Sequence, residues 1–127
     1  MEHRVIATGR APGAVGPYSQ AIEVDGWVWV SGQIPLDPET GVLVEGDAAA
    51  QARRALANVR GVLQAAGVDL DAVVRATVYL VDMDDFAAVN EVYAEFFGEH
   101  RPARACVEVR RLPKDARVEI DAVARTR

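Results

Sequence analysis

The chain has 127 residues, of which 50% are hydrophobic and 26% are charged, so it is long enough to bury a core and is not expected to be disordered. Its net charge is −5 and its arginines are scattered, which argues against the basic stripe of a nucleic-acid-binding protein. A single cysteine excludes an intrachain disulfide. We expect one domain over residues 1–127.

We expect no targeting segment at the start of the chain. The start, MEHRVIATGRAPG, lacks the apolar stretch of a signal peptide, and no segment approaches membrane-spanning length. We therefore expect a cytoplasmic protein with no membrane partner. The locally basic stretches near the C-terminus are interpreted as solvated surface in preference to an RNA site.

The first predicted elements are three short strands. Residues 4–8 form a strand candidate, followed by a loop rich in glycine and proline. Two alternating runs at 20–24 and 27–31 are joined by Asp25 and Gly26. This dipeptide favours a type I′ hairpin turn, which needs positive φ at both positions.

A long, turn-rich connection over 32–46 leads to the first predicted helix, Asp47 to Ala66. Its apolar positions recur every three to four residues, at Ala52, Leu56, Val59, Leu63 and Ala66. Asp47 is expected to cap its start and Gly67 to end it.

The run 72–81 is the most strand-like of the chain. A second helix follows, capped by Asp84 or Asp85 and ending at Gly98. Its expected buried stripe consists of Phe86, Val89, Tyr93, Phe96 and Phe97.

Strands at 103–109 and 117–124 complete the order β-β-β-α-β-α-β-β. This order predicts an α+β fold, a mixed sheet with two helices covering one face.

Two of the strands are apolar on both faces. In the run 72–81, alternation places Val74 with Ala76 on one face and Val73 with Tyr79 on the other. In 27–31 two valines oppose two tryptophans. A sheet that is apolar on both faces needs a second cover, so we expect another copy of the chain to provide it.

Arg104 lies in a strand of small and apolar residues, on the face that alternation also gives to Cys106. A guanidinium in such a place needs an anion, either a substrate carboxylate or an internal acid from Glu108, Glu119 or Asp121. Cys106 is interpreted as a small buried residue and not as a nucleophile, because neither histidine is placed to act as its base.

Four further positions carry features that a core does not require: Tyr18 in a loop, Ser31 and Gly32 at the end of the Trp-rich strand, and Asn90 on the second helix. Each also has an ordinary structural reading, as a surface tyrosine, a strand-ending turn or a surface amide. The sequence alone leaves both open.

Glu119, with Asp121 on the same strand face, would flank Arg104 if the strands 103–109 and 117–124 are neighbours. A glutamate in a cleft can hold and deprotonate a water. The alternative is an acid that faces solvent.

The sequence does not contain the residue patterns of several other kinds of active site. The sequence holds no cluster with metal-ligand spacing, no glycine-rich phosphate loop of the known types and no supported Ser–His–Asp arrangement.

Four segments in this order resemble the RidA family, reactive intermediate deaminase A, also called YjgF: GPYSQA, SGQIP, PAR and LPKDARVEIDA. The resemblance covers nearly the whole chain. It implies a chorismate-mutase-like subunit in a homotrimer with a central β-barrel and clefts between subunits. It also implies cofactor-free hydrolysis of reactive enamines and imines, such as 2-aminoacrylate and 2-iminopropionate, to a 2-keto acid and ammonia.

The family's carboxylate-binding arginine falls on Arg104 and its water-positioning glutamate on Glu119. The family's cleft-lining positions fall on Tyr18, Ser31, Gly32, Asn90 and Cys106. Where many relatives carry an aromatic residue before the proline of PAR, this chain has Arg101, so we expect a more basic and more open rim.

Two other functions stay open at this stage. One is an RNA-acting inhibitor of translation, which the acidic balance disfavours. The other is a trimer that binds 2-keto acids, or acts as a chaperone, without turnover; such a protein would not need a base at Glu119.

Overall fold

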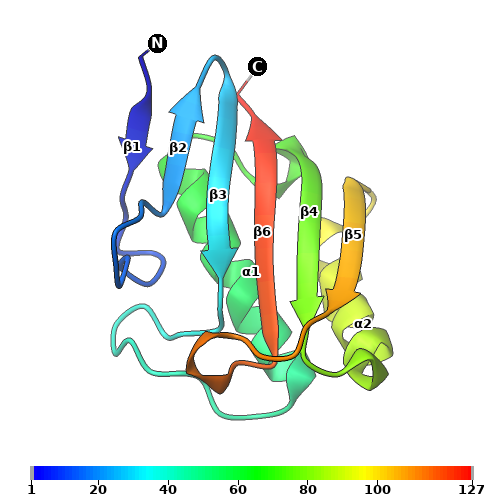
Figure 1. Ribbon diagram of the computed structural model, residues 1–127. Helices are drawn as coiled ribbons and strands as arrows, with labels where there is room; N and C mark the ends of the chain where they lie inside the picture. The colour runs from blue at the N-terminus through cyan, green and yellow to red at the C-terminus, as the bar shows by residue number, and fades with distance from the viewer. Residues whose placement is uncertain (1, 127) are drawn as a thin grey trace.

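The computed structural model describes residues 2–126, and its elements follow in the order expected (Figure 1). They are β1 (Arg4–Ile6), β2 (Ala21–Val24), β3 (Trp27–Gln33), α1 (Ala48–Ala65), β4 (Val73–Leu80), α2 (Phe86–Phe97), β5 (Ala103–Glu108) and β6 (Val118–Arg125). Short 3₁₀ helices lie at Leu70–Ala72, Met83–Asp85 and Pro113–Asp115.

The strands form one six-stranded sheet in the order β1-β2-β3-β6-β4-β5. All neighbours are antiparallel except β4 and β5, which are parallel. Both helices lie on the same face of this sheet (Figure 1). The predicted α+β class, a mixed sheet with two helices on one face, is confirmed.

Local signals in the sequence determine several turns. Asp25 and Gly26 have φ values of 52° and 80°, as a type I′ turn between β2 and β3 requires. Asp47 caps α1 by accepting a 3.0 Å hydrogen bond from the backbone of Ala50. Gly67, with φ of 89°, follows the end of the same helix.

The start of α2 differs from the expectation. Asp85 precedes the helix, but its side chain makes no capping hydrogen bond. Its two carboxylate oxygens instead accept hydrogen bonds of 3.1 and 2.9 Å from Nη2 of Arg117. This ion pair connects the start of α2 to the segment that leads into β6.

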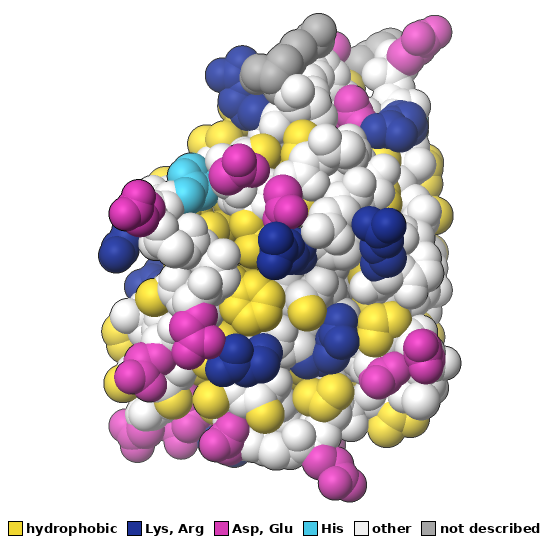
Figure 2. Space-filling model, turned by 180° about the vertical axis from the view of Figure 1, so that it is seen from behind, with side chains coloured by type: hydrophobic (Ala, Val, Ile, Leu, Met, Phe, Trp, Pro, Cys, Tyr) yellow, Lys and Arg dark blue, Asp and Glu magenta, His cyan; other side chains and the backbone are white. Residues whose placement is uncertain are grey.

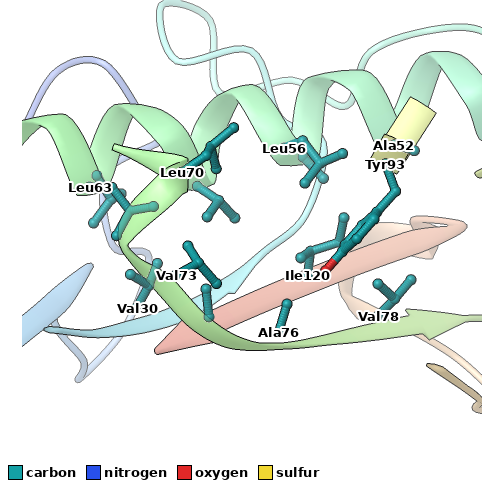
Figure 3. Packing of buried hydrophobic residues seen from close by; sticks show 14 of the residues in the cluster. Val30, Ala52, Leu56, Leu63, Leu70, Val73, Ala76, Val78, Tyr93 and Ile120 are labelled. Carbon is teal, nitrogen blue, oxygen red and sulfur yellow. The ribbon is translucent and has the colours of Figure 1, made fainter. Parts of the chain in front are cut away.

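The core lies between the helices and the central strands (Figure 3). Leu56 from α1 and Tyr93 from α2 point toward Ile120 of the sheet, and Leu63 lies farther along α1, beside Val30 and Val73. Fully burying an aliphatic side chain of this size stabilises the fold by about 1.5–3 kcal/mol. This packing fixes which face of β4 and β6 the helices cover.

One predicted face assignment is wrong. Val73 is buried, whereas Val74 is 42% exposed. The register between β4 and β6 shifts between Val73 and Arg75, and this irregularity reverses the alternation at the start of the strand. Val74 therefore does not share the buried face of Ala76.

The face of the sheet away from the helices carries large apolar side chains. Trp29 is 53% exposed and Val107 is 40% exposed, while Val28 and Val30 are buried beneath the helices. The prediction that β3 is apolar on both faces is thus confirmed. We call this helix-free surface the open face.

The opposite, helix-covered side is shown in Figure 2. On it, basic and acidic side chains are interspersed with apolar ones and form no continuous stripe of one sign. None of the helices within residues 2–126 has the length and apolar composition needed to cross a bilayer.

Candidate functional site

Arg104 lies on the helix-covered face of β5, where it pairs with the buried Ala76 of β4. Its Nη1 donates a 2.7 Å hydrogen bond to Oδ1 of Asn90 on α2. The guanidinium carbon lies 4.8 Å from the ring centroid of Tyr93 and 5.6 Å from that of Phe86. These contacts stabilise the positive charge by cation–π attraction without neutralising it.

None of the acidic side chains within residues 2–126 forms an ion pair with Arg104. The carboxylate of Glu108 accepts a 2.8 Å hydrogen bond from a backbone amide before α2. That of Asp121 accepts a 2.9 Å hydrogen bond from a tyrosine hydroxyl. The internal ion pair that the sequence left open is therefore not formed, and donors of Arg104 remain for an external anion.

A cavity of about 380 Å³ lies beside this guanidinium. Its walls include Asn90, Tyr93 and Phe97 from α2, and Arg101 and Arg104 from the segment that enters β5. None of its lining residues is acidic. We call it the Arg104 pocket; its size and charge suit a small anion.

Cys106 shares the helix-covered face with Arg104 and packs, partly buried, against the core. Burial raises the pKa of its thiol, while the charge of Arg104 lowers it to a smaller extent. A thiol with a raised pKa stays protonated and is a poor nucleophile. Within residues 2–126, no three His, Cys, Asp or Glu side chains gather as metal ligands.

Glu119 lies on the open face, because its neighbours along β6 are buried beneath the helices. Its carboxylate lies above Gly32 of β3, where an added Cβ would come within 2.9 Å of the carboxyl carbon. Only a glycine at position 32 leaves space for the carboxylate in this position. A cavity of about 320 Å³, the Glu119 cavity, is bounded by Glu119, Gly32, Tyr18 and Lys114 together with neighbouring loop residues.

Burial raises the pKa of the Glu119 carboxyl above its ordinary value, and the negative charge of Asp121 raises it further. A carboxylate of this kind binds a proton more readily than a solvated glutamate. It is suited to accept a proton from a water and to return it later.

Tyr18 and Ser31 lie close together through the loop before β2. Tyr18 is half exposed, and its hydroxyl accepts a 3.4 Å hydrogen bond from the backbone of Val15. The hydroxyl of Ser31 donates a 2.6 Å hydrogen bond to the carbonyl of Ser19. Ser31 therefore holds the loop that carries Tyr18, and it is not among the residues that line the Glu119 cavity.

The two halves of the predicted site lie on opposite faces of the sheet. Arg104 pairs with Ala76, and Glu119 pairs with Tyr79 on the same strand. Ala76 and Tyr79 are three residues apart, so their side chains point to opposite faces. One small molecule cannot contact both groups of the same chain.

The expectation that strands 103–109 and 117–124 are neighbours is wrong. In the sheet, β4 lies between β5 and β6. The connection that follows β5 passes the end of β4, because β5 pairs in parallel with β4 at the edge of the sheet. A short connection thus does not place consecutive strands side by side here.

The family model described as Endoribonuclease L-PSP matches residues 8–126. A human protein named 2-iminobutanoate/2-iminopropanoate deaminase is 52% identical over 121 residues, which cover 95% of this chain and 88% of the relative. A RutC family protein from Pyrococcus abyssi is 53% identical over 124 residues, or 98% of each chain. The chain belongs to the RidA/YjgF family.

Solved structures of this family share the fold throughout. A putative endoribonuclease from Thermotoga maritima is 48% identical with a TM-score of 0.96, covering 100% of this chain and 99% of the other. Escherichia coli TdcF with bound serine is 46% identical with a TM-score of 0.92, covering 96% and 98%. The family predicted from the sequence motifs is confirmed, and relatives about half identical carry the name of imine deaminases.

Sequence reasoning missed some residues of both halves of the candidate site. Phe86 and Tyr93 were expected only as part of a buried stripe, yet they flank the guanidinium of Arg104. Their spacing around Asn90, at four and three residues, places all three on one helix face and was a usable signal. Lys114 in the Glu119 cavity has a left-handed backbone, with φ of 57°, which no pattern indicated.

Proposed function

We propose that the chain hydrolyses reactive enamines and imines, 2-aminoacrylate, 2-iminopropionate and related 2-imino acids, to 2-keto acids and ammonia. The observation that carries the proposal is the guanidinium of Arg104, held by neutral groups beside a pocket and paired with no acid in residues 2–126. The deaminase names of relatives about half identical support the same reaction class.

Arg104 would bind the substrate carboxylate through two charge-assisted hydrogen bonds, each worth about 1.5–3 kcal/mol. This anchoring fixes the imine carbon relative to a water held by Glu119. Glu119 takes a proton from the water as its oxygen adds to the carbon. Glu119 returns this proton to the nitrogen, which gives the carbinolamine. The hydroxyl proton of the carbinolamine then passes through Glu119 to the amino group, and the C–N bond breaks as the C=O bond forms, giving the keto acid and ammonia.

The remaining residues would support these two. Asn90 orients the guanidinium through its amide oxygen. Gly32 leaves space for the carboxylate, and Tyr18 closes the same cavity. Ser31 positions the loop of Tyr18, and Cys106 contributes backbone beside Arg104. The reaction needs no metal or organic cofactor, since the substrate is already reactive toward water.

The site would be completed between copies of the chain. Because Arg104 and Glu119 lie on opposite faces, the Arg104 pocket of one copy must meet the Glu119 cavity of a neighbour. Trp29 and Val107 give the open face the apolar surface that an interface between subunits buries. We propose a homotrimer whose sheets form a central barrel with three such clefts.

Two other functions are weaker. An RNA-acting protein is suggested by the description of the family model, but the chain carries a net charge of −5 and its helix side mixes both signs (Figure 2). A trimer that only binds 2-keto acids would have no use for a carboxyl with a raised pKa above a glycine. Loss of turnover in Glu119→Gln with retained binding of keto acids separates catalysis from binding alone.

The test is keto-acid and ammonia release from imines generated in situ by an amino-acid oxidase. Arg104→Ala should lower kcat/KM by about a hundredfold or more, because two charge-assisted hydrogen bonds are lost. Arg104→Lys keeps the charge but not the planar fork of donors, so its kcat/KM should lie between those of the wild type and Arg104→Ala. Wild-type turnover retained in folded Arg104→Ala would remove Arg104 from this role.

A further inference from the structure

The Arg104 pocket contains a second guanidinium group, that of Arg101. Arg101 lies three residues before Arg104, and both line the same cavity of about 380 Å³. Three extended residues span at most about 10–11 Å. The backbones of Arg101 and Arg104 are therefore close enough for their long side chains to reach the same small ligand.

Neither guanidinium is paired with a carboxylate in residues 2–126, and the rest of the lining brings none. Some arginines elsewhere on the chain have acidic partners, as Arg53, Arg60 and Arg117 do, but only Arg101 and Arg104 line this cavity together. Two unpaired cations in one partly enclosed pocket repel each other. A ligand with two negative charges would relieve this repulsion, whereas a monoanion would offset only part of it.

Part of the pocket wall is apolar. Tyr93 and Phe97 line it, with their ring centroids 4.5 Å apart. Such a wall suits a short aliphatic spacer between two charged ends.

We propose that the Arg104 pocket selects 2-imino acids whose side chain ends in a second carboxylate. Arg104 binds the carboxylate next to the imine, and Arg101 binds the one on the side chain. Water adds to the imine carbon and ammonia leaves, as in the proposed function on which this inference rests, and the second carboxylate is unchanged. Arg101 is thus a specificity-determining residue.

The test compares the imines formed in situ from glutamate and from glutamine, which are similar in size and differ by one negative charge. Wild type should show a kcat/KM about fivefold higher for the acid than for the amide, the effect of one partly exposed charge-assisted hydrogen bond. In Arg101→Gln, the ratio of the two kcat/KM values should fall to about one. Arg110→Gln is the matched control: it removes the same charge from an exposed arginine outside the pocket lining and should keep the ratio. A wild-type ratio of one or less, or an equal change in both variants, overturns the inference.

A calorimetric titration with stable keto acids makes the result independent of turnover. 2-Oxoglutarate should bind more tightly than 2-oxobutanoate, and Arg101→Gln should reduce that difference while Arg110→Gln does not. If no imine is hydrolysed, the proposed function fails and the titration alone decides this inference. Equal affinities for the two keto acids overturn it.

Discussion

The Arg104 pocket and the Glu119 cavity are built in different ways. Arg104 lies on a strand and is held by Asn90, Tyr93 and Phe86 of one helix, which rests on the core. The Glu119 carboxyl also starts from a strand, but its cavity is closed mainly by loops, including the turn at Lys114 with its left-handed backbone. The cation is held by a strand and a helix, while loops form most of the wall around the acid.

The electrostatic environments differ as well. Aromatic rings and an amide stabilise the charge of Arg104, whereas burial and Asp121 disfavour the charge of Glu119. A permanent cation suits the binding of an anion, and a carboxyl that readily accepts a proton suits proton transfer. The Arg104 pocket is thus suited to bind an anion and the Glu119 cavity to transfer a proton. Imine hydrolysis needs both properties, and neither half has both.

Co-expression of two inactive variants tests whether the halves work across copies. Arg104→Ala and Glu119→Gln should each be nearly inactive alone. If a cleft takes its arginine and its glutamate from different copies, random mixing in a symmetric ring restores about a quarter of the clefts. Activity would therefore rise from background to about a quarter of the wild-type value. No recovery in mixed oligomers, verified by two different affinity tags, would show that Arg104 and Glu119 do not act in one cleft.

Gly32→Ala tests whether activity depends on the close approach of the Glu119 carboxylate to Gly32 of β3. The added methyl group would displace the Glu119 carboxylate, and such a displacement should lower kcat by about ten- to a hundredfold. The fold should persist, because Gly32 is not among the positions with positive φ. Gly9→Ala is the matched control, since a Cβ there meets nothing within 4 Å. Equal rates in the two variants would show that the close approach of Glu119 to Gly32 has no role.

The pH dependence of kcat/KM reports the state of Glu119. As a base it must be ionised, and its raised pKa means that activity should increase with pH through a midpoint above the ordinary glutamate value of 4.5. Asp121→Asn removes the nearby negative charge and should move this midpoint to lower pH. Rates measured between pH 4 and 8 decide this, and an unmoved midpoint would exclude an electrostatic effect of Asp121.

Tyr93→Phe separates the role of the ring from that of the hydroxyl. The Tyr93 hydroxyl is buried and has no hydrogen-bond partner in the described part of the chain. Removing it should raise the free energy of unfolding by about 1 kcal/mol, while the ring remains next to Arg104. Tyr79→Phe is the contrasting variant: its hydroxyl bonds Asp121 at 2.9 Å, so the same change should destabilise by about 1 kcal/mol. Urea unfolding of both variants provides the comparison.

Local signals made most of the fold predictable. Hydrophobic periodicity, the Asp25-Gly26 turn and the Asp47 cap act over a few residues, and the elements that they indicate are present in the predicted order. The sequence motifs also identified the family. The wrong assignments concern pairing at a distance: the irregularity at Val74 and the position of β4 between β5 and β6 depend on tertiary contacts.

The sequence predicts which residues belong to the candidate site, but it does not predict their arrangement. Arg104 and Cys106 were correctly placed on one strand face, since alternation is a local property. Which side of the sheet Glu119 occupies relative to Arg104 depends on strand order, and no short pattern encodes it. The contacts of Arg104 with Phe86 and Asn90 likewise require α2 to pack beside β5.

The placement of the two pockets on opposite faces has a consequence for oligomers that mix two kinds of chain. In the proposed ring, every copy serves two clefts, giving its cation to one and its acid to the other. A chain defective in both groups therefore disables two of its assembly's clefts. When such a chain is expressed with an equal amount of wild-type chain, about a quarter of the clefts should keep both groups, below the half expected if each copy formed a site of its own.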